Sequence, residues 1–158
     1  MGYTHYFETK GEIRINVPVI KAIVEKFKDI IDHDETSDQN CIVNDEMILL
    51  NGIEDLGHET FVIRGNVKEW EFCKTARKPY DIVVCMILLV LKKENGKMFS
   101  FSSDGFCKKG IDNEWYEATK VLNEMCFIKD HRVCLESEGS TPFDWNKLLG
   151  SVYMKEAE

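Results

Sequence analysis

The longest apolar run in the chain, residues 82–91 (IVVCMILLVL), places a strong constraint on the fold because it must be buried. It falls well short of the roughly 20 residues that a helix needs to cross a bilayer. Pro79 and Asp81 precede the run, and the pair Lys92–Lys93 follows it. A proline in the first turn, an early acid and late cations are typical of a helix. We therefore predict a buried helix, with a buried strand as the alternative because the run is short and rich in β-branched residues.

Three other segments have helical signals. Residues 17–31 and 113–126 carry apolar residues at amphipathic spacing, which predicts two helices packed on a core. The apolar faces are Val17, Ile20, Val24, Phe27 and Ile31 in the first, and Trp115, Ala118, Leu122 and Met125 in the second. A last helix is predicted from Thr141 through Leu149, with Thr141 as N-cap and Pro142 at the first helical position.

Short alternating segments bounded by Gly, Asn or Asp predict about five strands, at residues 2–7, 46–50, 60–64, 69–73 and 97–102. Short turns join the middle three, which predicts an antiparallel meander with helices on one face. The fold class is therefore α+β: a single domain with a mainly antiparallel sheet and three or four helices. Residues 1–129 are predicted to form the core domain. Residues 130–158 are predicted to be a helical C-terminal extension packed on it, and residues 33–40 a polar surface loop.

Charge and composition exclude several classes of protein. A formal net charge of -8 argues against binding to a DNA or RNA polymer or to a membrane surface. The six cysteines form no CxxC pair and are interpreted as free thiols. The four histidines, at 5, 33, 58 and 131, are not paired at ligand spacing, so no metal and no cofactor are predicted. The N-terminus lacks the features of a signal peptide, which predicts a cytoplasmic location.

The run 72–81 (FCKTARKPYD) places three cations and a hydroxyl where a strand is predicted to turn into a helix. The free N–H groups and the dipole of a helix start favour negative charge, so helix capping does not explain Lys74, Arg77 and Lys78. A phosphate or carboxylate ligand would explain them, with the Thr75 hydroxyl as a neutral donor. The alternative is a solvated loop in which the cations pair with Glu69, Glu71 or Asp81.

Other polar and aromatic residues lie near the ends of predicted elements. If those ends converge, they form a concave site with rings for a base, cations for phosphates and an acid for a ribose. The structural alternatives are a satisfied core or edge-strand histidine for His5, a loop histidine that caps a turn for His58, packing for Tyr80 and a type I turn for Asp104. The predicted ligand-binding residues are Tyr3, His5, His58, Lys74, Thr75, Arg77, Lys78, Tyr80 and Asp104.

Several motifs resemble those of a family of small, uncharacterised proteins encoded mainly by bacteriophages and found in some bacteria. They are GYTHYF at 2–7, HETF at 58–61, FCKTARKPYD at 72–81 and SSDG at 102–105. The chain departs from the family pattern at Phe7, where Trp is expected, and at 106–110, which looks like an insertion. The resemblance does not extend past residue 129. It implies a setting in a phage-infected host cell rather than a mechanism.

Two functions fit the predicted site. In the first, the protein sequesters a phosphate-bearing signalling molecule, such as a cyclic nucleotide or an ADP-ribose derivative, and so acts as a sponge that counters host immunity. In the second, it is a phosphodiesterase or nucleotide hydrolase that uses His5 or His58 as acid or base. A third reading is an inhibitor that binds a host protein directly. We favour sequestration and predict no catalytic residue, because the sequence lacks a Walker loop, a Gly-rich dinucleotide turn and a carboxylate cluster for divalent metals.

The predicted partners are a small anionic, nucleotide-like ligand and further copies of the chain. A domain of 158 residues encloses a nucleotide more completely when two copies share the pocket. We therefore expect a homo-oligomer, most simply a dimer.

Overall fold

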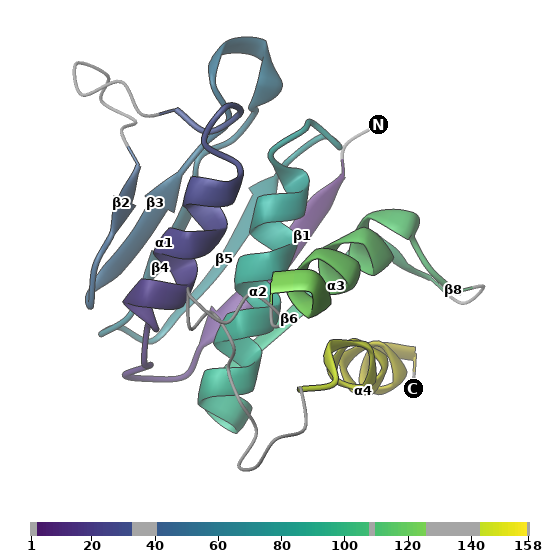
Figure 1. The fold of residues 1–158 in the computed structure, drawn as a ribbon. Coiled ribbons are helices and arrows are strands. Elements are labelled where there is room, and N and C mark those ends of the chain that lie inside the picture. The colour runs from purple at the N-terminus through teal and green to yellow at the C-terminus, as the bar shows by residue number, and fades with distance from the viewer. Residues whose placement is uncertain (1–2, 33–40, 108–109, 126–142, 158) are drawn as a thin grey trace.

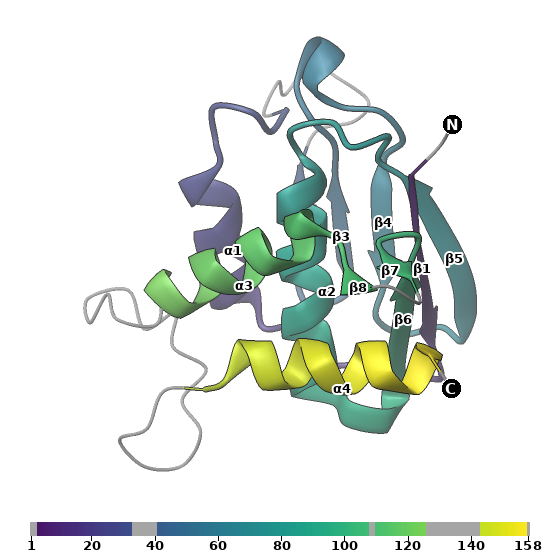
Figure 2. The same cartoon turned by 90° about the vertical axis from the view of Figure 1, so that its right-hand side faces the viewer.

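The computed structural model describes residues 3–32, 41–107, 110–125 and 143–157. It shows a single α+β domain in two layers, as the sequence predicts. The helices α1 (Val17–Lys26), α2 (Asp81–Asn95), α3 (Asn113–Met125) and α4 (Trp145–Ala157) lie on one side of the strands. Figure 2 shows the strands on the other side of the domain, where no helix or strand of the described residues covers the sheet face opposite the helices. No helix of the described residues is long and apolar enough to span a membrane.

The strands form two three-stranded antiparallel sheets and a short hairpin. The first sheet has the order β5 (Glu69–Lys74), β1 (Thr4–Thr9), β6 (Phe99–Ser103). The second has the order β2 (Ile42–Val43), β3 (Met47–Leu50), β4 (Phe61–Arg64), and the hairpin joins β7 (Phe106–Cys107) to β8 (Gly110–Ile111). Two short 3₁₀ turns, η1 (Glu54–Leu56) and η2 (Gly96–Met98), precede β4 and β6.

The predicted meander is right for β3 and β4 and wrong for β5. Strand β5 pairs with β1 over six residues, with Phe72 opposite Tyr6. The end of β5 is joined to the segment before β4 by a backbone hydrogen bond, in which the Glu59 N–H donates to the Lys74 carbonyl at 3.2 Å. Strand β1 offers β5 a longer partner than the four residues of β4, so the distant pairing takes precedence over the local one.

Helix α2 forms the centre of the core, and every residue from Val83 to Leu91 is buried. The prediction of a helix rather than a buried strand is confirmed. The helix ends where Gly96 adopts a φ of +53°, a conformation that glycine reaches without strain, and the Gly96 N–H bonds back to the Lys92 carbonyl. Helices α1 and α3 pack along its sides (Figure 1).

Helix α1 is shorter than predicted. The Asn16 side chain accepts a hydrogen bond from the Val19 N–H and caps its start, and the helix ends at Lys26 rather than at Ile31. Ile31 is buried as predicted, but it reaches the core through a bridge to Gly52. The polar loop predicted at 33–40 lies outside the described residues.

Helix α4 also differs from the prediction, because it begins at Trp145 and runs past Leu149 to Ala157. Asp144 Oδ1 accepts the Lys147 N–H at 3.0 Å and caps the start. The predicted cap, Thr141 with Pro142, lies outside the described residues. Trp145, Leu149 and Val152 are buried in the same hydrophobic core as α2.

The burial of Trp145 yields a test of whether α4 is an integral part of the domain. Replacing Trp145, which is 1% exposed, should remove its packing and leave a cavity. We expect Trp145→Ala to lower the free energy of unfolding by roughly 3–5 kcal/mol in urea titrations followed by circular dichroism. Met154→Ala, on the same helix but 60% exposed, is the control and should change it by less than about 0.5 kcal/mol. Equal effects of the two changes would show that α4 does not share the core.

Candidate functional site

The sheet register brings most of the predicted site residues to one end of the domain. Thr4, near the start of β1, lies opposite Lys74 at the end of β5, and His5 lies opposite both Cys73 and Ser103. The segment 75–80 then crosses from β5 to the start of α2. The ends of the elements therefore converge, but the side chains divide into a buried group and an exposed group.

The buried group is a continuous hydrogen-bonded network. The Thr75 hydroxyl donates to Asp81 Oδ1 at 2.5 Å, and His5 Nε2 lies 2.6 Å from the same oxygen. His5 Nδ1 lies 2.8 Å from Ser103 Oγ. His5 and Thr75 are fully buried, and Asp81 is 3% exposed. The network thus joins β1, the loop after β5, α2 and β6.

Ser103 determines which ring nitrogen of His5 carries the proton. Its hydroxyl oxygen accepts hydrogen bonds from the Gly105 N–H at 2.9 Å and from Trp115 Nε1 at 3.1 Å, two groups that can only donate. A hydroxyl oxygen has two acceptor sites, so the Ser103 proton must be donated to His5 Nδ1. This hydrogen-bond count leaves Nδ1 as the acceptor and places the imidazole proton on Nε2, directed at Asp81. The geometry corresponds to the satisfied core histidine of the structural alternative.

The same network contains three residue types that bind metals. His5, Asp81 and Cys85 each have a ligand atom within 4.8 Å of the other two, and all three are buried. The sequence spacing hides this cluster because β1 and α2 meet only in the fold. A metal on Nε2 would move the imidazole proton to Nδ1, where its acceptor would be a Ser103 oxygen that already accepts two hydrogen bonds. Burial, followed by the nearby Asp81, raises the pKa of the Cys85 thiol well above its usual value and opposes the thiolate that a metal requires. The donor set therefore fits a hydrogen-bonded network better than a metal centre.

Ser103, His5 and Asp81 are also the residue types of a nucleophilic triad. Ser103 is only 7% exposed, and both acceptor sites of its oxygen are used by Gly105 and Trp115. The lone pair that would attack a substrate is therefore already engaged. In this arrangement the three residues connect structural elements rather than form a reactive centre.

The loop over this network has an unusual backbone. Ala76 and Arg77 have φ values of +51° and +57°, in the left-handed region that residues with a Cβ rarely adopt. The N–H groups of Thr75 and Ala76 both donate to the Tyr3 carbonyl, at 3.0 and 3.3 Å. Such conformations persist only where the surroundings hold them, so this loop stores local strain.

Arg77 holds the loop from outside. Its guanidinium donates to Asp112 Oδ2 at 2.7 Å and to Glu114 Oε1 at 2.6 Å, and lies 4.0 Å from the centre of the Tyr3 ring. The hydrogen bonds to Asp112 and then Glu114 raise the pKa of Arg77 above its already high value. Pairing with acids, the alternative to an anion ligand, is therefore realised for Arg77, although with partners other than Glu69, Glu71 or Asp81.

The negative charge expected at the start of α2 comes from the chain itself. Asp81 is the first residue of α2, where the helix dipole and free N–H groups favour a carboxylate. This removes part of the reason for placing an external anion there.

Lys74 and Lys78 differ from Arg77. Among the residues that the structure describes, neither ammonium group forms an ion pair. Lys74 is exposed, and its Nζ lies 5.9 Å from the centre of the Phe72 ring. Lys78 is half-buried, and its N–H donates to the Thr75 carbonyl. These two lysines are the cations that remain available to a ligand.

His58 and Asp104 lie at the same end. His58 is exposed, and its backbone N–H and carbonyl are both bonded to the Asn51 side chain. Asp104 is exposed and accepts hydrogen bonds from the Thr4 N–H at 3.1 Å and the Tyr6 hydroxyl at 3.3 Å. Both therefore have structural contacts and still reach the surface.

The two predicted tyrosines are buried instead. Tyr80 is fully buried behind the loop, and its hydroxyl donates to the Glu59 carbonyl. Burial, then the neighbouring Cys73, raises its pKa. Tyr3 is 3% exposed and packs its ring edge against His5 at 5.1 Å. Neither ring offers a free face to a ligand at the surface.

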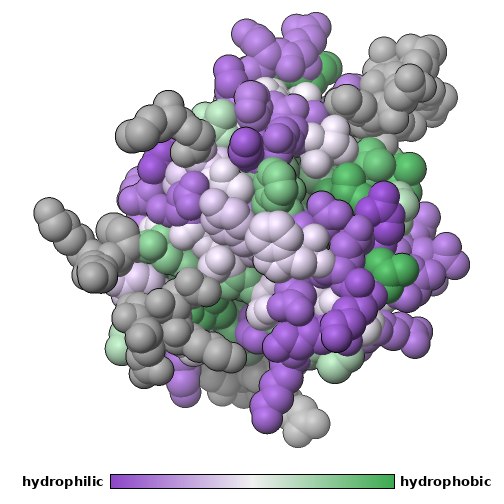
Figure 3. Space-filling view, turned by 180° about the vertical axis from the view of Figure 1, so that it is seen from behind, coloured by the Kyte–Doolittle hydropathy of each residue, from purple (hydrophilic) through white to green (hydrophobic). Residues whose placement is uncertain are grey.

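The prediction overlooked the exposed aromatic residues on the uncovered sheet face. Trp70 is 60% exposed and Phe72 43% exposed, and the Trp70 ring stacks on Tyr6 at 6.2 Å. The alternation in 69–73 (EWEFC) could have revealed them, because it places Trp70 and Phe72 on the face opposite Cys73. Figure 3 shows this side of the molecule, where pale and green patches lie among hydrophilic ones.

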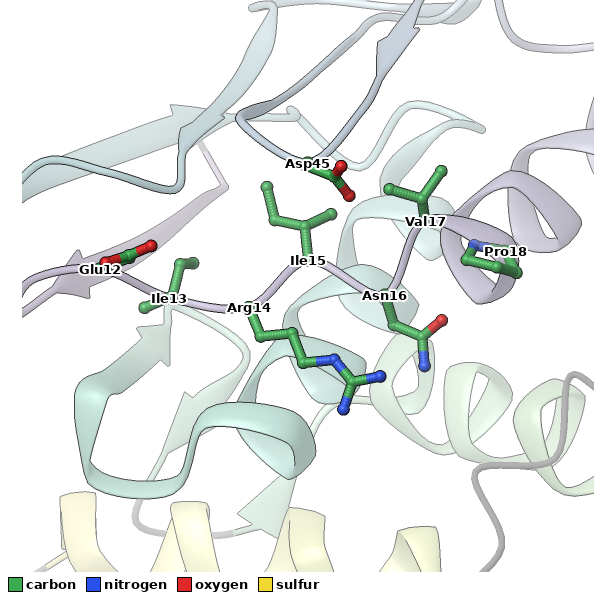
Figure 4. A pocket seen from close by; sticks show the side chains of 8 residues that line it. All are labelled: Glu12, Ile13, Arg14, Ile15, Asn16, Val17, Pro18 and Asp45. Carbon is green, nitrogen blue, oxygen red and sulfur yellow. The ribbon is translucent and has the colours of Figure 1, made fainter.

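A separate hollow of about 610 Å³ lies at the segment that connects β1 to α1 (Figure 4). Its lining mixes apolar and charged groups and includes none of the predicted site residues: Glu12, Ile13, Arg14, Ile15, Asn16, Val17, Pro18 and Asp45. Figure 4 shows Arg14 pointing away from Asp45 across the segment. Arg14 forms a loose ion pair with Glu94 at 3.6 Å, so this hollow has no concentrated charge for a ligand.

Cys41, Cys73 and Cys85 are free thiols, as predicted. Burial raises the pKa of the Cys73 thiol to about 12. The side chains of Cys107, Cys126 and Cys134 and the histidines at 33 and 131 lie outside the described part of the chain.

Comparison with known proteins gives no match: no family model, no curated protein and no solved structure is significantly similar to this chain.

The network leads to a test at Ser103. We expect Ser103→Ala to lower the free energy of unfolding by roughly 2–4 kcal/mol, because it removes the acceptor of Gly105 and Trp115 and the donor to His5. Ser102→Ala, the adjacent position on the outer face of β6, is the control and should cost less than about 0.5 kcal/mol. Nitrogen-15 spectra of the native protein should show the His5 proton on Nε2. A proton on Nδ1 would contradict the network described here.

Proposed function

We propose that the protein binds a small phosphate-bearing, nucleotide-like molecule and holds it without converting it. The observation that carries the proposal is the presence of two unpaired lysines, Lys74 and Lys78, at the end of a sheet where exposed aromatic and acidic groups also lie. Neither lysine forms an ion pair with any residue that the structure describes.

Each part of such a ligand has a chemical counterpart at this end. The ammonium groups of Lys74 and Lys78 suit phosphate oxygens. The ring of Phe72, 43% exposed beside Lys74, offers a stacking face for a base. The Asp104 carboxylate can accept hydrogen bonds from ribose hydroxyls. Arg77, already bonded to two acids, contributes chiefly by holding the loop in place.

Binding is favoured over hydrolysis by the state of the histidines. His5 is fully buried and both of its ring nitrogens are bonded, so it cannot act as a general acid or base from this arrangement. His58 is exposed, but its mapped contacts are through its backbone. Of the two histidines considered as acid or base, His5 and His58, the phosphodiesterase alternative would therefore depend on His58.

The resemblance to phage-encoded proteins supports a biological role for such binding. A protein that captures a nucleotide signal in the host cytoplasm would deprive an immune effector of its messenger. Tight retention is sufficient for this role, and no catalytic group is needed.

Ligand retention and conversion can be separated in one experiment. Purified protein is incubated with a panel of cyclic dinucleotides and ADP-ribose derivatives, washed, and denatured by heat, and the supernatant is analysed by mass spectrometry. We expect release of an intact molecule. Release of a chemically altered molecule would favour the enzyme reading. No retention across the panel would contradict nucleotide binding and favour an inhibitor that binds a host protein.

Variants at the two lysines test the location of the site. Lys74→Ala and Lys78→Ala should each lower the affinity for the retained nucleotide by roughly tenfold or more in calorimetry, because each removes a charge-assisted contact to phosphate. The control is Lys97→Ala, an exposed lysine near the opposite end of the same sheet, which should bind as the parent does. Melting temperatures should be similar for all three variants. Normal binding by both the Lys74→Ala and the Lys78→Ala variants would show that the ligand binds elsewhere.

A further inference from the structure

The uncovered face of the β5–β1–β6 sheet has two unlike halves. On the β5 side, Trp70 and Phe72 project as a bulky aromatic ridge, with the Trp70 ring stacked on Tyr6 of the central strand. On the β6 side stand the small residues Ser100 and Ser102. A hollow of about 190 Å³ lies beside them, with Tyr6 and Trp70 also in its lining.

The two halves also differ in charge at one end. Lys74 lies at the end of β5, opposite Thr4 of β1. Asp104 follows β6, and its carboxylate accepts the Thr4 N–H from the other side. A cation and an acid therefore flank the same residue of the central strand.

We infer that a second copy of the chain covers this face. The two copies are related by a two-fold axis that runs parallel to β1 and lies between the two facing sheets. This rotation exchanges the β5 and β6 halves while it keeps the ends of the strands in place. In the strand register, Phe72 and Ser102 both lie opposite Tyr6, and Trp70 and Ser100 both lie opposite Glu8. The rotation therefore sets the Trp70–Phe72 ridge of each copy over the Ser100–Ser102 side of the other. Each Lys74 meets the Asp104 of the second copy.

This arrangement agrees with the general packing of sheets. Two sheets stack face to face about 10 Å apart with their strands nearly aligned, and side chains of the two faces interdigitate. A ridge over a row of small residues meets that requirement, whereas two ridges face to face would not. The interface is isologous, so the same surface serves both copies.

One group opposes association. Glu8, on the central strand, lies near the proposed axis, where it would approach the Glu8 of the second copy. Like charges so placed weaken the interface. Removal of this charge in Glu8→Gln should therefore strengthen the dimer, an effect that loss of a ligand contact would not produce.

The inference goes beyond the proposed ligand binding and can fail separately from it. The interface engages Lys74, Phe72 and Asp104, which the proposed ligand also contacts, so ligand binding would compete with the dimer. The axis along β1 would bring the loops that carry Lys78 in both copies to the same end of the dimer. The dimer itself needs no ligand, so it is tested with the purified protein alone.

The first test is sedimentation equilibrium of the full chain from low micromolar to several hundred micromolar. We expect a dimer, roughly 30-fold or more weakened by Trp70→Asp, which places a charge in the centre of the interface. Tyr116→Asp is the matched control, since Tyr116 is 49% exposed on α3 and lies on the helical side. Circular dichroism should show both variants folded. A monomer at every concentration, or a dimer unaffected by Trp70→Asp, would overturn the inference.

The second test uses complementary charges. Lys74→Glu alone and Asp104→Lys alone each create like-charge contacts between identical copies, and should weaken the dimer by roughly three- to tenfold. A mixture of the two variants places opposite charges at both contacts of a mixed dimer. We therefore expect mixing to restore association to near the parent level. Two weakened variants that do not associate on mixing would contradict the proposed axis, even if a dimer exists.

Discussion

The hydrogen bond between His5 and Asp81 is the contact on which this end of the structure depends. Asp81 begins the central helix and is buried, so its charge must be compensated within the protein. The helix N-terminus, the Thr75 hydroxyl and the His5 imidazole supply that compensation. Ser103 then fixes His5 from the other side and connects β6. Loss of any one of these four side chains would leave another buried polar group without a partner. The polar residues of the network therefore depend on one another within an otherwise apolar region.

The cationic run serves two purposes in this structure. Arg77 is committed to Asp112 and Glu114, and through them it holds a strained loop against the start of α3. Lys74 and Lys78 have no ion pair within the described residues. A motif read as one anion site is therefore divided between a structural clamp and two available charges. The proposed ligand depends on the second part alone.

The two faces of the sheet have different physical roles. The inner face builds the core with α2, whose residues from Val83 to Leu91 are buried. The outer face exposes Trp70 and Phe72, although burying such rings is favourable in water. That imbalance is the reason for inferring a second copy there. Lys74, Phe72 and Asp104 take part in both the inferred interface and the proposed ligand site, so the second copy and the ligand compete for these side chains.

The sequence by itself determined the fold class, the central helix and most of the strands, because apolar periodicity and turn residues are local signals. It also located the polar run at a strand-to-helix junction. Only the tertiary structure decided that β5 pairs with β1, that Asp81 is hydrogen-bonded to His5, and that Arg77 is paired with Asp112 and Glu114. The hydrogen-bonded side chains among these contacts are far apart in the sequence, by 35 positions for Arg77 and Asp112 and by 76 positions for His5 and Asp81. No local pattern encodes such a contact, since its partner is selected by how the whole chain packs.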